Sequence, residues 1–136
     1  SPRHIVVGVG MDSIKGYWRQ WGLFDNGRLP IGHMHSNLLQ IALERGVPAL
    51  IVWLIMLGMY GRALWKTIRK SHHGNGIAED FPRALALGAL GGLIGFFVSG
   101  LVHYNWGDSE VVMVFYLIMG LSLCCSGMLF AKELSE

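Results

Sequence analysis

Two histidines precede the predicted start of a short helix, and a long apolar segment follows that helix directly. The stretch reads His33-Met34-His35-Ser36-Asn37-Leu38-Leu39-Gln40-Ile41-Ala42-Leu43-Glu44-Arg45-Gly46. Ser36 or Asn37 can cap the helix, and Gly46 followed by Pro48 ends it and begins the next one. A helix N-terminus favours a bound anion and a neutral imidazole beside it. Next to a bound phosphate, a neutral His35 can therefore accept a proton.

This stretch resembles a signature of the O-antigen ligase and polymerase family of bacterial membrane glycosyltransferases. In that family a histidine is followed by Asn, Ser or Gln, then by nine residues and a glycine, which matches His35, Ser36 and Gly46. The His-x-His pattern before a Leu-Gln pair matches as well. Ser36 replaces the commoner Asn, and Ala49 stands where ligases often carry Gly or Thr. Neither departure affects the histidine.

The resemblance implies transfer of a glycan from undecaprenyl diphosphate to an acceptor hydroxyl, on lipid A core or on a growing glycan chain. The diphosphate is already a good leaving group, so the site needs a base and cations. No nucleotide, metal or other cofactor is expected. We expect His35 to be the catalytic base. The other expected site residues bind the substrate, and they are His33, Arg19, Arg28, Asp108 and Glu110.

Composition points to a membrane protein. Of the 136 residues, 52% are hydrophobic and 15% charged, and the hydrophobic residues fall in long blocks, which argues against a soluble domain. The net charge of +2, without basic residues interleaved with aromatics, argues against nucleic acid as a partner. The adjacent Cys124 and Cys125 lie in an apolar run, where we expect them to pack and to form no disulfide.

We expect an all-α, multi-pass membrane protein with three transmembrane helices and a periplasmic segment containing a short amphipathic helix. The expected parts are a periplasmic segment at 1–46, spans at 47–69, 84–104 and 111–131, a cytoplasmic loop at 70–83, a periplasmic turn at 105–110 and a cytoplasmic tail at 132–136. Each span has about the 20 residues that cross a bilayer. The chain begins with Ser and shows no signal peptide, so we expect a C-terminal fragment that is inactive without its upstream arginines.

Charge distribution predicts the orientation in the bacterial inner membrane. Residues 66–83 contain four Lys or Arg residues, whereas residues 104–110 contain none. By the positive-inside rule the first loop is cytoplasmic, which puts His33 and His35 on the periplasmic side among membrane lipids. Arg62, near the cytoplasmic end of its span, is expected to anchor the helix by extending its side chain to the interface.

The first 32 residues contain a Gly8-Val9-Gly10 element and several aromatic residues. A nucleotide-binding loop is disfavoured because Ser13 stands where the third glycine would be, so we expect a tight turn. The aromatic rings of Tyr17, Trp18 and Trp21 have helix-like spacing and indicate an amphipathic segment at the membrane interface.

Two rows of small residues mark the second span. Gly88 and Gly92 form one row, and Gly91, Gly95 and Ser99 form the other. Small residues four apart let helices approach closely, so we expect this span to be buried among other helices.

The turn from His103 to Glu110 is expected on the same side of the membrane as His35. Its acidic residues either cap the third span or provide a carboxylate that orients a histidine or binds a sugar hydroxyl. A different class of function is a non-catalytic transporter or scaffold segment, in which the histidines gate a pathway or only occupy the interface. Transporter segments usually place charges inside their spans, and the second and third spans have none.

Overall fold

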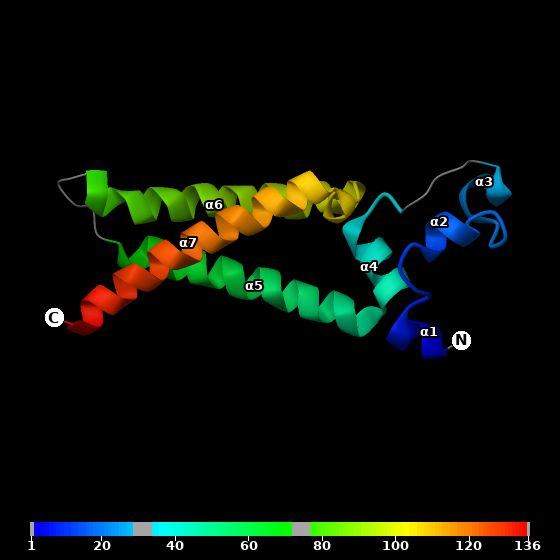
Figure 1. The fold of residues 1–136 in the computed structure, drawn as a ribbon, viewed down its shortest axis with the longest axis horizontal. Coiled ribbons are helices and arrows are strands. Elements are labelled where there is room, and N and C mark those ends of the chain that lie inside the picture. The colour runs from blue at the N-terminus through cyan, green and yellow to red at the C-terminus, as the bar shows by residue number, and fades with distance from the viewer. Residues whose placement is uncertain (1, 29–33, 72–76, 136) are drawn as a thin grey trace. The chain divides into compact units, whose positions relative to one another are not determined.

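The structure is a computed structural model that describes residues 2–28, 34–71 and 77–135. Its elements in chain order are α1 (Pro2–Val7), α2 (Ser13–Tyr17), α3 (Leu23–Gly27), α4 (Asn37–Arg45), α5 (Val47–Lys70), α6 (Ile77–Val102), the 3-10 turn η1 (Asn105–Gly107) and α7 (Ser109–Ser135) (Figure 1). Within the described ranges every regular element is helical. The predicted all-α fold class is therefore confirmed.

Three helices are long and apolar enough to cross a membrane. The qualifying stretches are Val47–Lys70, Asp80–Val102 and Ser109–Met128. The predicted spans at 47–69, 84–104 and 111–131 have somewhat different bounds. Helix continues into polar residues at the end of α5, the start of α6 and both ends of α7, whereas α6 ends at Val102, two residues before the predicted end. The largest difference is at α6, which begins at Ile77 and contains Pro82 near its start. The coarse prediction of a multi-pass membrane segment therefore agrees with the lengths and hydropathy of these helices.

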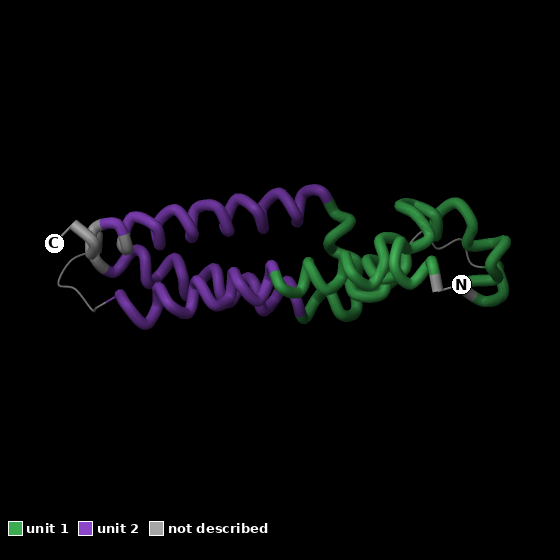
Figure 2. The backbone as a smooth tube through the Cα atoms, turned by 90° about the horizontal axis from the view of Figure 1, so that it is seen from below, with its two compact units in different colours: residues 1–55, 98–108 green, residues 56–97, 109–136 purple. Residues whose placement is uncertain are grey.

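The chain forms two compact units, shown in different colours in Figure 2. Unit 1 consists of residues 1–55 and 98–108, and unit 2 consists of residues 56–97 and 109–136. Unit 1 thus contains the histidine motif and the 103–108 turn. Unit 2 contains most of the residues of α5, α6 and α7.

Within unit 2, α5 and α7 are joined by hydroxyl groups. The Tyr60 hydroxyl and Ser122 Oγ lie 2.8 Å apart, and the Thr67 and Ser126 hydroxyls lie 2.6 Å apart. The four side chains are buried. Interhelical hydrogen bonds of this kind substitute for the hydrophobic effect, which cannot drive helix association inside lipid.

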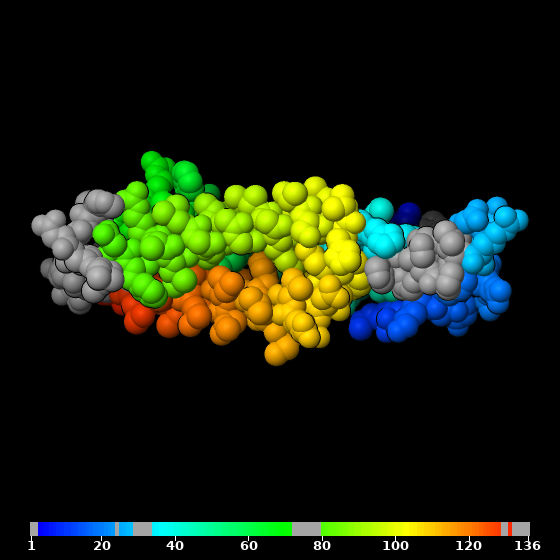
Figure 3. Space-filling model, turned by 90° about the horizontal axis from the view of Figure 1, so that it is seen from above, coloured from blue at the N-terminus to red at the C-terminus, as the bar shows by residue number. Residues whose placement is uncertain are grey.

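Aromatic stacking joins α6 to α7 in the same unit. The rings of Phe96 and Phe115 stack with centroids 4.6 Å apart, and the ring of Tyr60 meets Phe115 edge-on at 6.1 Å. Figure 3 shows side chains of α6 and α7 along one face of this unit. A buried aromatic centre therefore packs between the three long helices.

The glycine rows of α6 do not have the predicted packing role within the described chain. A Cβ atom added at Gly88, Gly91, Gly92 or Gly95 would meet no heavy atom within 4 Å. The buried face of α6 in unit 2 instead consists of Ala86, Ala89, Leu93 and Phe96. These side chains are larger than glycine, so they fill the space beside α5 and α7 and bury more apolar area than the glycine rows would.

Candidate functional site

The histidine motif and the 103–108 turn meet through one buried amide in unit 1. Asn37, the first residue of α4, is only 1% exposed. Its Nδ2 donates to Asn105 Oδ1, and its Oδ1 accepts the backbone N–H of Trp106 at 3.0 Å. A Cβ at Gly100 would collide with the Asn37 amide, so glycine is required there for α4 to approach α6. Two polar segments that are distant in the sequence are thus hydrogen bonded to each other.

An aromatic contact reinforces this junction. The indole rings of Trp53 and Trp106 meet nearly at right angles, with centroids 5.5 Å apart. Edge-to-face pairs of this kind contribute about 0.5–1.5 kcal/mol beyond the area they bury. Trp53 is buried, so the contact also fixes the start of α5 against the turn.

The backbone on both sides of His35 is held in place. Before it, the Met34 backbone N–H donates to Gln40 Oε1 at 2.7 Å, and Gln40 is 3% exposed. After it come buried Ser36 and the hydrogen-bonded Asn37. The His35 side chain itself is exposed. A histidine on a fixed backbone with an accessible ring can act on an external substrate.

Ser36 occupies the N-cap position of α4 with an extended backbone, but its side chain makes no capping hydrogen bond, so the prediction that its hydroxyl caps the helix is wrong. The alternative capping residue, Asn37, uses its amide for the 105–106 turn instead. The first N–H groups of a helix are without intrahelical partners and attract anions. The N-terminus of α4 therefore retains donors that neither of these side chains occupies.

The end of α4 is hydrogen bonded to the Gly8–Gly10 segment. The Val9 N–H donates to the Leu43 carbonyl at 2.8 Å and the Gly10 N–H to the Glu44 carbonyl at 3.1 Å. These carbonyls lie in the last turn of a helix, where partners must come from outside it. The Gly8–Gly10 segment is not the predicted tight turn: it is an irregular connection with a bend at Val9, and the hydrogen-bonded turn starts at Gly10, whose carbonyl accepts the Ser13 N–H at 3.3 Å. The segment satisfies the C-terminus of α4.

Both glycines at this contact have positive φ and no room for a side chain. Gly8 has φ +73° and Gly46 has φ +86°. A Cβ at Gly8 would collide with the Glu44 carbonyl, and a Cβ at Gly46 would collide with the Val6 carbonyl. The glycine that closes the histidine motif is thus required by backbone packing against the other glycine element.

The partly buried phenol of Tyr104 interacts electrostatically with Arg45 and with two acidic residues. Burial raises the pKa of Tyr104, the Arg45 charge opposes the rise, and the Glu44 and Asp12 charges add to it. Glu44 is 5% exposed, and its Oε1 has no hydrogen-bond partner in the described structure. Buried carboxylate oxygens without a donor are rare. Glu44 is therefore a candidate acceptor for a ligand hydroxyl, and the sequence showed no sign of it because burial of a helical Glu depends on its neighbours in space.

Asp108 lies beside a histidine other than His35. Its Oδ2 is 3.7 Å from His103 Nε2, and both side chains are more than half exposed. Glu110 lies in the first turn of α7, where a carboxylate complements the helix dipole, so each of the two roles predicted for the acidic turn has a matching feature in the structure. His103 was not among the predicted site residues, although its position in the same turn could have indicated it.

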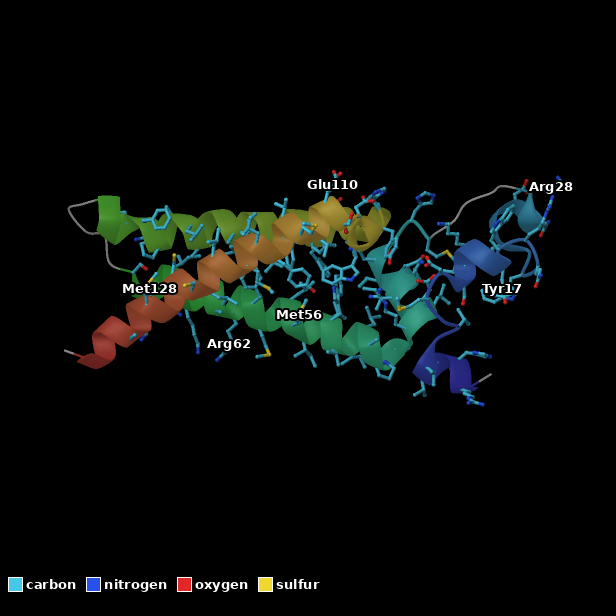
Figure 4. The ribbon with its side chains drawn as sticks, in the orientation of Figure 1. Tyr17, Arg28, Met56, Arg62, Glu110 and Met128 are labelled. Atoms are coloured by element: carbon cyan, nitrogen blue, oxygen red, sulfur yellow. The ribbon has the colours of Figure 1, made fainter. Side chains whose placement is uncertain are left out.

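The remaining predicted site residues are not brought to His35 by the described contacts. Arg19 and Arg28 are exposed and lie in the region of α2 and α3, where Figure 4 labels Arg28. Glu110 is exposed in the first turn of α7 and belongs to unit 2. His33 lies outside the described residues.

Among the residues that the structure describes, no group of three or more His, Cys, Asp or Glu side chains could hold a metal ion. No protein-family model matches the chain, and neither a curated protein nor a solved structure matches it.

Proposed function

We propose that this chain is the C-terminal part of a membrane glycosyltransferase resembling the O-antigen ligases and polymerases. It transfers a glycan from undecaprenyl diphosphate to an acceptor hydroxyl, such as one on lipid A core, at the periplasmic face of the bacterial inner membrane. The observation that carries the proposal is the fixed backbone around His35, within a stretch that has the spacing of the family signature.

In the proposed reaction His35 is the general base. Its neutral imidazole removes the proton from the acceptor hydroxyl, and the resulting oxygen attacks the anomeric carbon of the lipid-linked glycan. The bond from that carbon to the diphosphate oxygen breaks, and undecaprenyl diphosphate leaves with the bonding electrons. A well-placed base contributes about 10²–10⁴ in rate. The step needs no metal ion, because arginine side chains can neutralise the departing phosphates.

Other features of unit 1 fit the remaining requirements of this reaction. The N-terminus of α4 offers backbone donors to a phosphate group. Glu44, with its buried oxygen lacking a donor, offers an acceptor for a hydroxyl of the sugar. Asp108 can bind a second hydroxyl or hold His103. Arg19 and Arg28 are cations for the diphosphate, and His33 is a further polar contact.

The test is glycan transfer by the complete protein carrying His35→Ala, measured in membrane vesicles with a lipid-linked glycan donor. Transfer should fall by at least about a hundredfold, while membrane insertion is unchanged. His4→Ala is the matched control, because its side chain is also exposed in unit 1 but the residue lies in α1, outside the motif. Near-normal transfer by the His35 variant would exclude His35 as the base and favour the non-catalytic scaffold function.

A further inference from the structure

The carboxyl-terminal turns of α5 form a cationic depression with a volume of about 290 Å³. It belongs to unit 2 and has no part in the proposed transfer reaction. The lining residues are Arg62, Trp65, Lys66, Arg69 and Lys70.

These lining residues lie on one face of α5. They recur at spacings of three and four, which places side chains next to one another on a helix. The opposite face of the same turns is buried and consists of Tyr60, Leu64, Thr67 and Ser71. Figure 4 shows Arg62 extending from α5 on the side away from α6. The depression therefore opens toward the surroundings of the protein.

The positive charge of this face is not balanced within the helix. No Asp or Glu occurs in α5. In the described structure, Arg62, Lys66 and Arg69 form no ion pair. Like charges three and four residues apart on a helix repel one another. An anion bound among them would remove this repulsion.

The depression also has the chemistry and position of a lipid headgroup site. Trp65 is 55% exposed within it, and indole rings favour the headgroup layer of a membrane. From Arg62 to Lys70 the helix rises by about 12 Å, which is enough to extend from the edge of the hydrocarbon through the headgroups. Guanidinium and ammonium groups bind phosphate oxygens by charge-assisted hydrogen bonds.

We propose that this face of α5 binds the phosphate of an anionic phospholipid, in the membrane leaflet that surrounds the carboxyl end of the helix. Arg62, Lys66 and Arg69 bind the phosphate oxygens, and the ring of Trp65 packs against the glycerol and upper acyl chains. A lipid is favoured over a soluble phosphate because the depression is continuous with an apolar, membrane-length helix.

The test measures quenching of Trp65 fluorescence by brominated lipids. The full chain is reconstituted in phosphatidylcholine vesicles that contain brominated phosphatidylglycerol or, in a parallel sample, brominated phosphatidylcholine. Subtracting the signal of Trp65→Phe isolates Trp65 from the other tryptophans. We expect a clear preference of Trp65 for phosphatidylglycerol, falling about fivefold for each cation removed. The triple variant Arg62→Gln, Lys66→Gln, Arg69→Gln should lose the preference.

Arg3→Gln is the matched control, because Arg3 is exposed in α1 and does not line the depression. It should retain the preference for phosphatidylglycerol. Equal quenching by both brominated lipids in the unmodified chain would overturn the proposal. An unchanged preference in the triple variant would also overturn it. So would loss of the preference in the unmodified chain when millimolar inorganic phosphate is added at constant ionic strength, because that result would identify a site for free phosphate.

Discussion

Replacing Asn37 by Ala tests whether one amide holds the histidine motif against the 103–108 turn. The substitution removes the donor to Asn105 and the acceptor of the Trp106 N–H. Each hydrogen bond contributes about 0.5–1.5 kcal/mol net, so the junction should lose about 1–3 kcal/mol. Since 1.4 kcal/mol corresponds to tenfold in an equilibrium constant, local opening should become roughly five- to 150-fold more frequent.

Amide hydrogen exchange in detergent micelles measures this opening directly. The Trp106 amide should exchange faster in Asn37→Ala by the same factor, whereas Leu39→Ala should leave it unchanged, because Leu39 is 57% exposed on the same helix. A double-mutant cycle with Asn105→Ala isolates the contribution of the pair and should give a coupling of about 0.5 kcal/mol or more. Unchanged exchange of the Trp106 amide would refute the reasoning.

Three further predictions follow from other contacts. Gly46→Ala should destabilise the protein by about 1–3 kcal/mol and so lower its unfolding temperature in detergent, because φ is +86° and the new Cβ would collide with backbone. Gly120→Ala, which has open space around it, should not lower the unfolding temperature. Equal effects of the two substitutions would contradict the packing argument. Arg45→Gln should raise the Tyr104 pKa further, because the Arg45 charge opposes its rise; an ultraviolet phenolate titration corrected with Tyr104→Phe tests this, and an unmoved pKa would show that the two do not interact. Ser126→Ala should lower the thermal stability of unit 2 by about 0.6–1.7 kcal/mol, and an unaltered melting curve would show that this hydroxyl pair contributes nothing.

The raised pKa of Tyr104 also makes stability depend on pH in a definite direction. The folded state holds the phenol proton more tightly than the unfolded state does. The resulting stabilisation is complete below the unfolded value of about 10 and disappears as the pH rises through the higher folded pKa. Tyr104→Phe should remove this alkaline loss of stability, which thermal unfolding at several pH values would detect.

The sequence by itself determined the helical class, the three membrane-length segments and the break between α4 and α5. These features are local: the length of an apolar run decides whether a helix can cross a bilayer, and Gly46 followed by Pro48 ends one helix and starts another. An interruption of helix at Gly8 and Gly10 is local as well, because glycine is the residue that most readily adopts positive φ.

Only the tertiary structure decided which residues meet. Segments that are far apart in the chain meet where Asn37 contacts Asn105 and where Gly8 packs against the end of α4. The burial of Glu44 also depends on such neighbours, and no local sequence pattern encodes them. Within the described chain, the face of α6 that packs is not the one that carries its glycine rows. Which face of a helix is buried depends on the shape of its neighbours as well as on its own residues, and those shapes exist only after the helices have packed.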